Sequence, residues 1–208
     1  MVPNEVENAA ADRFERQIRF VLEIDRLKTI VRRTYLLHAD RAENTAEHSW
    51  HLAMMAILLS EYANEPVDVA RVVKMVLIHD IVEIEAGDTY FYDAVAELDK
   101  ADRERSAADR LFGILPLDQG EELRQLWDEF EAAATPDARF ALALDRFMPQ
   151  LHNYYTRGRS WVEHGITADR VLERNASMAE GSYKLWECAR ALVDDAVAKG
   201  FLASKKEK

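Results

Sequence analysis

The sequence predicts an all-α protein, a single compact helical bundle, and three observations lead to this fold class. Alanine, leucine, glutamate and arginine are abundant, and they favour helix. Only seven glycines and five prolines interrupt the 208 residues, too few for a sandwich or barrel of many short strands. Apolar residues recur at helical spacing, without a convincing strand pattern. One domain is the default at this length, and we expect it at residues 11–200, between flexible tails at 1–10 and 201–208.

The first elements follow from the helical period and its start signals. A helix is expected over residues 12–28, where apolar side chains recur at helical spacing. Residues 33–45 break that period and predict a loop packed on the body. Asn44 followed by Glu47 resembles a capping box, which predicts a helix from about Thr45 to Tyr62.

Later elements are predicted from prolines, glycines and caps. Pro66 and Asp68 begin a helix expected to run to about Ala86, where Gly87 is a plausible stop. Another helix begins at Thr135-Pro136, and Pro149 should end or kink it. The remaining helices are expected over residues 95–112, 118–134 and 167–199, the last with a break near residue 181.

Charge and cysteine usage exclude several classes of protein. The net charge of −11 argues against a sequence-independent nucleic-acid binder, which needs a basic face. The single cysteine, Cys188, cannot form an intramolecular disulfide and fits a reducing cytoplasm. The start MVPNEVENAAADRF lacks the basic and apolar regions of a signal peptide, and no apolar stretch is long enough for a membrane span. We therefore expect a cytoplasmic protein without a membrane or nucleic-acid partner.

One dipeptide places two ionisable side chains at the end of an apolar run. His79 and Asp80 follow the segment VVKMVLI, and burying such a pair is costly unless something compensates it. A divalent metal ion would do so, because imidazole and carboxylate are ordinary metal ligands. His48 and Asp145 supply the same ligand types elsewhere in the chain. The pattern H…HD…D indicates a metal site, although ordinary structural histidines would give the same spacing.

Glu83 lies on the same helical face as the dipeptide. It is four residues after His79 and three after Asp80, so its carboxylate would lie beside a metal held by that pair. His48 and Asp145 would come from other helices, which is how helical bundles build interior metal sites. Two histidines and two aspartates would leave coordination positions open for water and a substrate oxygen.

Four segments of the chain resemble one superfamily. They are LKTIVRRTYLL (residues 27–37), RAENTAEHSWHLAMMA (41–56), HDIVEIEAGD (79–88) and ALALDRF (141–147). With them the chain resembles the HD-domain metal-dependent phosphohydrolases, and more narrowly the small HD-domain 5′-deoxynucleotidases. The HD pair alone is a weak signal, but ENTAEHS with HDxxExxxGD and a late LD is strongly specific. The resemblance implies that residues 11–200 form an HD domain.

The resemblance implies a role for each matching residue. One divalent ion (Mn, Co, Fe, Zn or Mg) is implied as cofactor, with four ligands: His48, His79, Asp80 and Asp145. Glu83 matches the residue that positions or deprotonates the attacking water, and Asp88 matches an acidic residue near the sugar and the leaving oxygen. Arg32 matches the arginine that grips the phosphate, which suits a guanidinium. Arg33 offers a second phosphate contact.

The reaction implied is hydrolysis of (deoxy)nucleoside 5′-monophosphates to nucleoside and phosphate by a metal-bound water. No histidine lies between Asp80 and Asp145, where HD phosphodiesterases usually carry ligands for a second metal, so a mononuclear site is expected. In the well-studied branch a bulky aromatic follows the phosphate-gripping arginine and crowds the sugar 2′ position. Here Arg33 follows, and Tyr35 is the nearest aromatic, so deoxyribose selectivity stays open.

Two alternatives to this reaction stay open. One is an HD phosphohydrolase that acts on another phosphoester, such as a nucleoside di- or triphosphate. The other is a non-catalytic helical dimerisation or binding module. The resemblance also implies a homodimer, for which Trp161, Tyr183, Leu185 and Trp186 could form an interface, although ordinary core packing explains them better.

Overall fold

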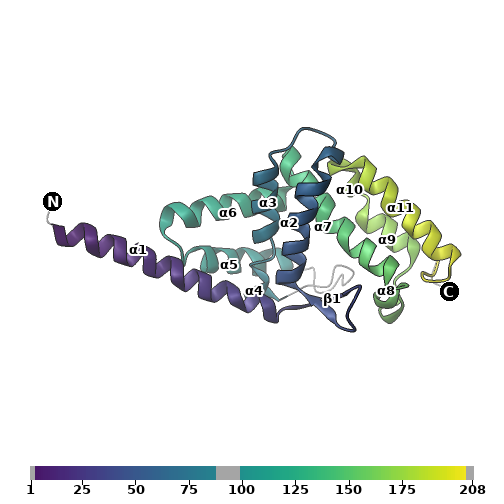
Figure 1. Cartoon of the computed structure of the whole chain (residues 1–208), viewed down its shortest axis with the longest axis horizontal. Helices are drawn as coiled ribbons and strands as arrows, with labels where there is room; N and C mark the ends of the chain where they lie inside the picture. Colours follow the sequence, from purple (N-terminus) through teal and green to yellow (C-terminus); the bar gives the residue numbers. More distant parts are fainter. Residues whose placement is uncertain (1–2, 88–98, 205–208) are drawn as a thin grey trace.

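The described part of the chain is mainly helical, with one two-stranded hairpin, which confirms the predicted fold class (Figure 1). The structure, a computed structural model, describes residues 3–87 and 99–204, with side chains from Asp12 onward. The helices in the first range are α1 (Pro3–Ile24), η1 (Asp25–Thr29), α2 (Thr45–Leu59), η2 (Ser60–Tyr62), α3 (Val69–Ile78) and α4 (Glu83–Ala86). Those in the second are α5 (Lys100–Phe112), α6 (Leu117–Ala132), α7 (Pro136–Tyr155), α8 (Arg159–Glu163), α9 (Ala168–Asn175), α10 (Met178–Gly181) and α11 (Tyr183–Ala198).

Helix α7 forms the centre of the fold and packs against α2, α3, α6, α10 and α11 (Figure 1). The predicted start is confirmed, because the Thr135 hydroxyl accepts a hydrogen bond from the Ala138 amide. The helix does not end at Pro149 but continues to Tyr155. Proline has no N–H to donate, so the Asp145 carbonyl lacks its usual helical hydrogen bond. Burial of the α7 residues on both sides of this point keeps the helix continuous.

The capping box predicted for α2 is present. The Asn44 side chain accepts from the Glu47 amide, and the Glu47 carboxylate accepts from the Asn44 amide. The ion pair with Arg41 and the hydrogen bond from Asn44 lower the pKa of Glu47 to about 2. The start of α2 is therefore fixed just before His48.

The segment predicted as a loop before α2 contains an antiparallel hairpin of β1 (Val31–Tyr35) and β2 (Ala42–Asn44). Residue Val31 is opposite Asn44, and Tyr35 is opposite Ala42. Side chains alternate along β1, so Arg32 turns toward the body whereas Arg33 is exposed. The prediction missed the hairpin because its strands are too short to show a clear alternating pattern.

The helix expected to continue through the His-Asp pair is interrupted after Ile78. Its start is as predicted, because the Asp68 carboxylate accepts from the first free amides of α3. Residues 79–82 form turns before α4, and Gly87 follows with φ 75°, consistent with the predicted stop. His79 and Asp80 therefore lie at a helix end, where the chain changes direction.

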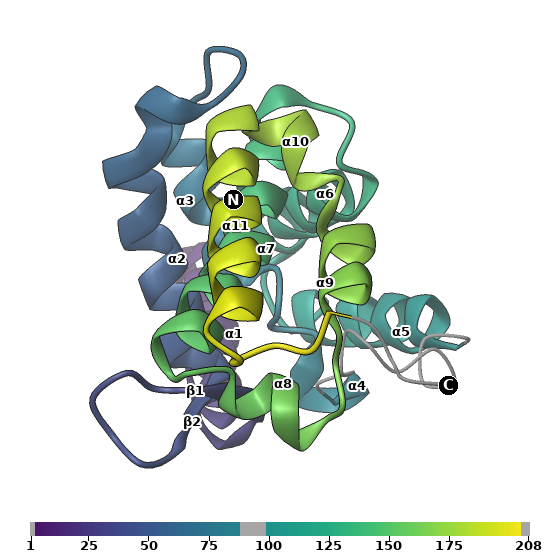
Figure 2. The same ribbon diagram turned by 90° about the vertical axis from the view of Figure 1, so that its right-hand side faces the viewer.

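The C-terminal region consists of several helices rather than one. The expected break is present, since α10 ends at Gly181 and α11 begins at Tyr183, but the short α8 was not predicted. A second, smaller core cluster joins α8, α9 and α11 (Figure 2). Leu202 is buried in it and Ala203 pairs with Thr167, so the packed body extends beyond residue 200. Trp161 and Leu185, considered for an interface, are core residues.

Helix α1 begins at Pro3, earlier than the expected start at residue 12, and extends away from the other helices (Figure 1). Phe20, near its C-terminal end, is buried in the main core, and polar contacts lie further along the helix. Arg13 pairs with Asp118, and Gln17 donates to Gln119. Within the described residues, no helix is both long enough and apolar enough to cross a membrane.

Candidate metal centre

Three residues from separate helices converge beside α7. His48 of α2, His79 at the end of α3 and Asp145 of α7 each offer one ligand atom, and these atoms lie within 4.8 Å of one another. His48 Nε2 is 3.0 Å and His79 Nε2 is 3.6 Å from the same oxygen, Asp145 Oδ1. Both histidines are buried, and Asp145 is half-buried. This group is the candidate metal centre.

Backbone contacts fix the orientation of His79. The Trp127 indole donates to the His79 carbonyl at 3.0 Å, and His79 Nδ1 lies 3.0 Å from the Val76 carbonyl. A carbonyl oxygen only accepts, so Nδ1 carries the proton in that hydrogen bond. In the neutral ring the lone pair is then on Nε2, which faces the centre.

The donor set fits a divalent cation. His79 Nε2 lies 3.1 Å from Asp80 Oδ2 and 3.6 Å from Asp145 Oδ1, and it has no hydrogen-bond partner among the described atoms. A buried lone pair that faces two carboxylate oxygens needs a positive ion, either a proton or a metal. Imidazole nitrogen with carboxylate oxygen is an ordinary donor set for divalent metals.

The histidines and carboxylates of the centre shift one another's pKa values. Burial opposes protonation of His79, but the Asp80 and Asp145 carboxylates outweigh it and raise the pKa of the imidazole well above its usual range. Burial would raise the pKa of Asp145, yet the hydrogen bond from His48 and the neighbouring His79 ring hold it well below its usual range. The carboxylates of the centre therefore stay ionised and require a nearby cation.

Asp80 adjoins the centre and connects it to Arg32. Its Oδ2 lies 3.1 Å from His79 Nε2 and 4.0 Å from His48 Nε2, so it is close to the three clustered ligands. The same oxygen accepts a 2.7 Å hydrogen bond from Arg32 Nη1. Burial opposes ionisation of Asp80, but the charges of His79 and Arg32 lower its pKa. Arg32 thus brings a guanidinium to the edge of the centre.

Glu83 lies in the same neighbourhood and is held by Thr45. The Thr45 hydroxyl donates to Glu83 Oε2 at 3.0 Å, and Arg32 Nη1 is 3.8 Å from Glu83 Oε1. Both Thr45 and Glu83 are buried. A carboxylate held in place beside a metal-binding cluster can orient a water or accept its proton.

The other predicted site residues have different positions. Arg33 is exposed on the opposite side of β1 from Arg32. Asp88 lies outside the described residues. His51, on α2, is half-buried next to His152, with ring centroids 5.5 Å apart, rather than in the cluster.

Sequence reasoning assigned no role to two residues beside the centre, Glu43 and Thr45. Glu43 is buried, with an oxygen 3.5 Å from His48 Nδ1 and 3.7 Å from Arg32 Nε. Thr45 precedes His48 by three residues, so helical spacing alone could have placed it on the same face. Glu43 had no comparable signal, because its position depends on the hairpin.

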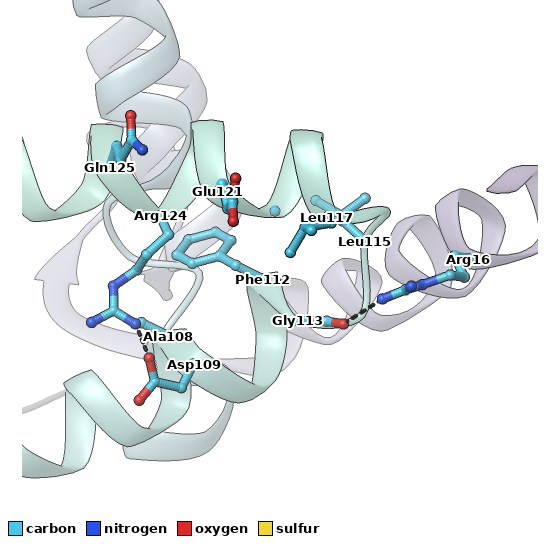
Figure 3. A pocket seen from close by; sticks show the side chains of 11 residues that line it. Arg16, Ala108, Asp109, Phe112, Gly113, Leu115, Leu117, Glu121, Arg124 and Gln125 are labelled. Carbon is cyan, nitrogen blue, oxygen red and sulfur yellow. Dashed lines mark hydrogen bonds and ion pairs between the residues drawn. The ribbon is translucent and has the colours of Figure 1, made fainter.

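One cavity of the described structure lies away from the centre. It has a volume of about 470 Å³, lies between α5 and α6, and reaches Arg16 of α1 (Figure 3). Phe112 forms part of its wall, and Arg124 pairs with Asp109 across it (Figure 3). None of its lining residues belongs to the cluster, so this cavity is separate from the metal centre.

The fold and the cluster together define a class of protein: an all-helical domain whose central helices hold a buried histidine–carboxylate centre suited to a divalent cation. The sequence also matches the family model of the HD domain over residues 24–186. The chain belongs to the HD-domain family.

Individual proteins show the same similarity. The 5′-deoxynucleotidase HDDC2 of Mus musculus is 25% identical over 185 residues, which cover 79% of this chain and 92% of the mouse protein. The 5′-deoxynucleotidase hdd1 of Schizosaccharomyces pombe is 30% identical over 130 residues, covering 60% of this chain and 64% of the yeast protein.

A solved structure extends this similarity to nearly the whole chain. A crystal structure from Magnetospirillum magnetotacticum, described as a predicted metal-dependent phosphohydrolase, is 55% identical with a TM-score of 0.88. The match covers 92% of this chain and 96% of that one. These findings confirm the predicted resemblance to HD-domain metal-dependent phosphohydrolases and the predicted enzyme class, a hydrolase.

Proposed function

We propose that this chain is a metal-dependent phosphomonoesterase that hydrolyses nucleoside and deoxynucleoside 5′-monophosphates to nucleoside and inorganic phosphate. The observation that carries the proposal is the position of Arg32. Its guanidinium contacts Asp80 and approaches Glu83, beside the cluster of His48, His79 and Asp145. An anion-binding group, a carboxylate and a candidate metal centre therefore adjoin one another. Two relatives are named 5′-deoxynucleotidases, which supports nucleoside 5′-monophosphates as the substrate class.

The proposed centre holds one divalent cation through His48, His79, Asp80 and Asp145. A bound divalent ion supplies Lewis acidity, which lowers the pKa of water and polarises the phosphoryl group. Mixed nitrogen and oxygen ligands suit Mn²⁺, Co²⁺, Fe²⁺ or Zn²⁺, with Mg²⁺ as a further option.

The chain's own residues carry out the remaining steps. Arg32 binds the phosphoryl oxygens and offsets their charge, since a guanidinium forms paired hydrogen bonds with phosphate. Glu83, held by the Thr45 hydroxyl, orients the attacking water and accepts its proton as the new P–O bond forms. The bond from phosphorus to the 5′ oxygen breaks, and that oxygen needs a proton. Asp88 is the proposed donor, as the motif implies.

We assign the phosphate contact to Arg32 rather than Arg33, because strand alternation directs only Arg32 toward the centre. The aromatic nearest in sequence does not crowd this site. The Tyr35 hydroxyl donates to Glu163 at 2.9 Å, and the Arg159 guanidinium lies 3.7 Å above its ring. We therefore propose that ribose and deoxyribose substrates are both accepted.

We further propose that the chain acts as a homodimer on a small nucleotide, without a nucleic-acid partner. Two exposed apolar stripes, on α1 and α2, support the dimer. The cytoplasmic location expected from the single cysteine stays a prediction.

A panel of phosphate esters tests the proposed reaction. Purified protein with Mn²⁺, Co²⁺ or Mg²⁺ is given dAMP, AMP, dTMP, dADP, dATP and a phosphodiester, and phosphate release is followed. We expect hydrolysis of the monophosphates at least about tenfold faster than that of the triphosphate, and dAMP and AMP within about tenfold of each other, since one hydroxyl contributes little without a contact that reads it. Faster triphosphate or diester hydrolysis would assign another substrate class, and no hydrolysis with any metal would favour a binding module.

A further inference from the structure

The Glu43 carboxylate has no role in the proposed reaction, although it is only 1% exposed. Within the part of the chain that the structure describes, neither of its oxygens has a hydrogen-bond partner. Burying an ionised group without hydrogen bonds is costly, so native proteins rarely retain one without a compensating function. Its surroundings indicate that function.

Three nitrogen atoms from three elements surround the carboxylate. His48 Nδ1 is 3.5 Å from Oε1, Arg32 Nε is 3.7 Å from the same oxygen, and His152 Nδ1 is 3.9 Å from Oε2. Burial lowers the pKa of His152, so this ring is neutral near pH 7. Arg32 therefore supplies the permanent positive charge beside Glu43.

A second metal site does not account for this carboxylate. Among the described residues, the only group whose ligand atoms come close enough to hold an ion is His48, His79 and Asp145. Glu43 does not belong to that group but lies next to it, and its oxygens are 3.5–3.9 Å from the three nitrogens, at or beyond the limit of a hydrogen bond.

The tautomer of His48 explains why its contact with Glu43 is long. His48 Nε2 lies 3.0 Å from Asp145 Oδ1, and a carboxylate only accepts, so in this arrangement the neutral ring carries its proton on Nε2. Nδ1 then has a lone pair, which faces the lone pairs of Glu43 Oε1. A cation bound at Nε2 requires that nitrogen's lone pair, so the neutral ring must carry its proton on Nδ1, facing Glu43.

We propose that Glu43 is a positioning residue, which accepts the Nδ1 proton of His48 and thereby holds Nε2 toward the metal centre. The same carboxylate balances the Arg32 charge and keeps its guanidinium at the edge of the centre. This inference rests on the proposed metal-dependent function. Partners of this kind fix the tautomer and orientation of metal-bound histidines, and their loss typically weakens metal binding 10- to 100-fold.

Metal titration of three variants tests the proposal. Glu43→Leu removes both charge and acceptor, whereas Glu43→Gln keeps an amide oxygen that can accept. Glu129→Gln on α6 removes one charge where the carboxylate pairs with Arg71 and Thr135, so it is the matched control. With Co²⁺ in competition against a chelating dye, we expect Kd to rise about 10- to 100-fold for Glu43→Leu and less for Glu43→Gln. The control should equal wild type.

The ring protons of His48 give a readout that needs no variant. In ¹⁵N NMR spectra, we expect the wild-type proton on Nε2 without metal and on Nδ1 after Zn²⁺ is added, protected from exchange. A wild type that binds Zn²⁺ without a protected Nδ1 proton overturns the role of Glu43, even if Glu43→Leu does not fold.

The outcomes separate this inference from the proposed function. Wild type that binds neither Co²⁺ nor Zn²⁺ contradicts both. Wild-type binding with a Glu43→Leu Kd unchanged within about threefold contradicts only the positioning role, because the expected loss is at least about tenfold.

Discussion

At the scale of the residue, two adjacent arginines, Arg32 and Arg33, differ in the direction of their side chains. Arg32 and Arg33 have the same chemistry, and the sequence offered both as phosphate contacts. Side chains point to opposite faces along a strand, so β1 turns Arg32 toward the centre and exposes Arg33. Arg32 then contacts Asp80, while Glu43 lies behind its Nε.

We expect Arg32→Gln to lower kcat/KM for dAMP by about 100-fold or more, because a group that offsets phosphoryl charge is worth this much in other enzymes. Arg33→Gln should change kcat/KM less than about threefold, since surface charges interact weakly with distant groups. Steady-state kinetics of both variants at saturating metal make the comparison. A larger loss for Arg33→Gln would mean that the wrong arginine has been assigned.

Three of the four ligands that the resemblance implied, His48, His79 and Asp145, lie close together. Asp80 adjoins them, and metal binding by the four stays a prediction. Glu43 and Thr45 lie inside the quoted segment RAENTAEHSWHLAMMA but were given no role. The roles proposed for them depend on contacts across elements, from Thr45 to Glu83 and from Glu43 to Arg32, which sequence spacing does not show.

At the scale of the element, α1 contacts the body through the buried Phe20 and through polar side chains. A stripe of large apolar side chains on the same helix is nevertheless exposed: Phe14, Ile18, Val21 and Leu22. Helix α2 exposes a stripe at the same spacing: Trp50, Met54, Ile57 and Leu58. Exposed apolar stripes of this kind mark interaction surfaces.

We propose that a second copy of this chain covers both stripes. At on the order of 100 Å² for each exposed side chain, the eight residues offer roughly 800 Å², about what each partner buries in a standard stable interface. In a twofold dimer, α1 of each copy would cover α2 of the other, so both stripes are satisfied by one closed arrangement.

We expect the wild type to have twice the chain mass of 23.9 kDa in size-exclusion chromatography with light scattering. Leu22→Glu and Ile57→Glu should each shift it toward the monomer, because a charge at the centre of an apolar interface is desolvated without a partner. Val162→Glu, which changes an exposed apolar residue of α8, is the control and should stay dimeric. A dimeric Leu22→Glu together with a dimeric Ile57→Glu would place the interface elsewhere.

Element boundaries were predictable where capping chemistry is local, as at Asn44, Asp68 and Thr135. They were not predictable where packing overrides local signals. Helix α7 continues through Pro149, buried in the core on both sides of it, whereas α3 ends at Ile78 and residues 79–82 form turns. That turn places His79 beside its partners.

At the scale of the whole molecule, the fold brings together residues that are far apart in sequence. Helix α7 contains Asp145 and packs against both α2 and α3. Helix α2 contains His48, and His79 directly follows α3. The hairpin adds Arg32 and Glu43 at the edge of this centre. The described fold thus supports one centre built from four elements.

Metal content measured together with phosphate release tests the central claim most directly. Wild type, Asp145→Asn and Asp128→Asn, an exposed aspartate of α6, are incubated with Co²⁺, freed of unbound metal, and assayed with dAMP. We expect about one ion per chain for wild type and Asp128→Asn, as a single-centre site requires. Asp145→Asn should lose most of its metal and at least about 100-fold of its activity, because a lost ligand removes the Lewis acid. Wild-type metal content and activity in Asp145→Asn would contradict the account.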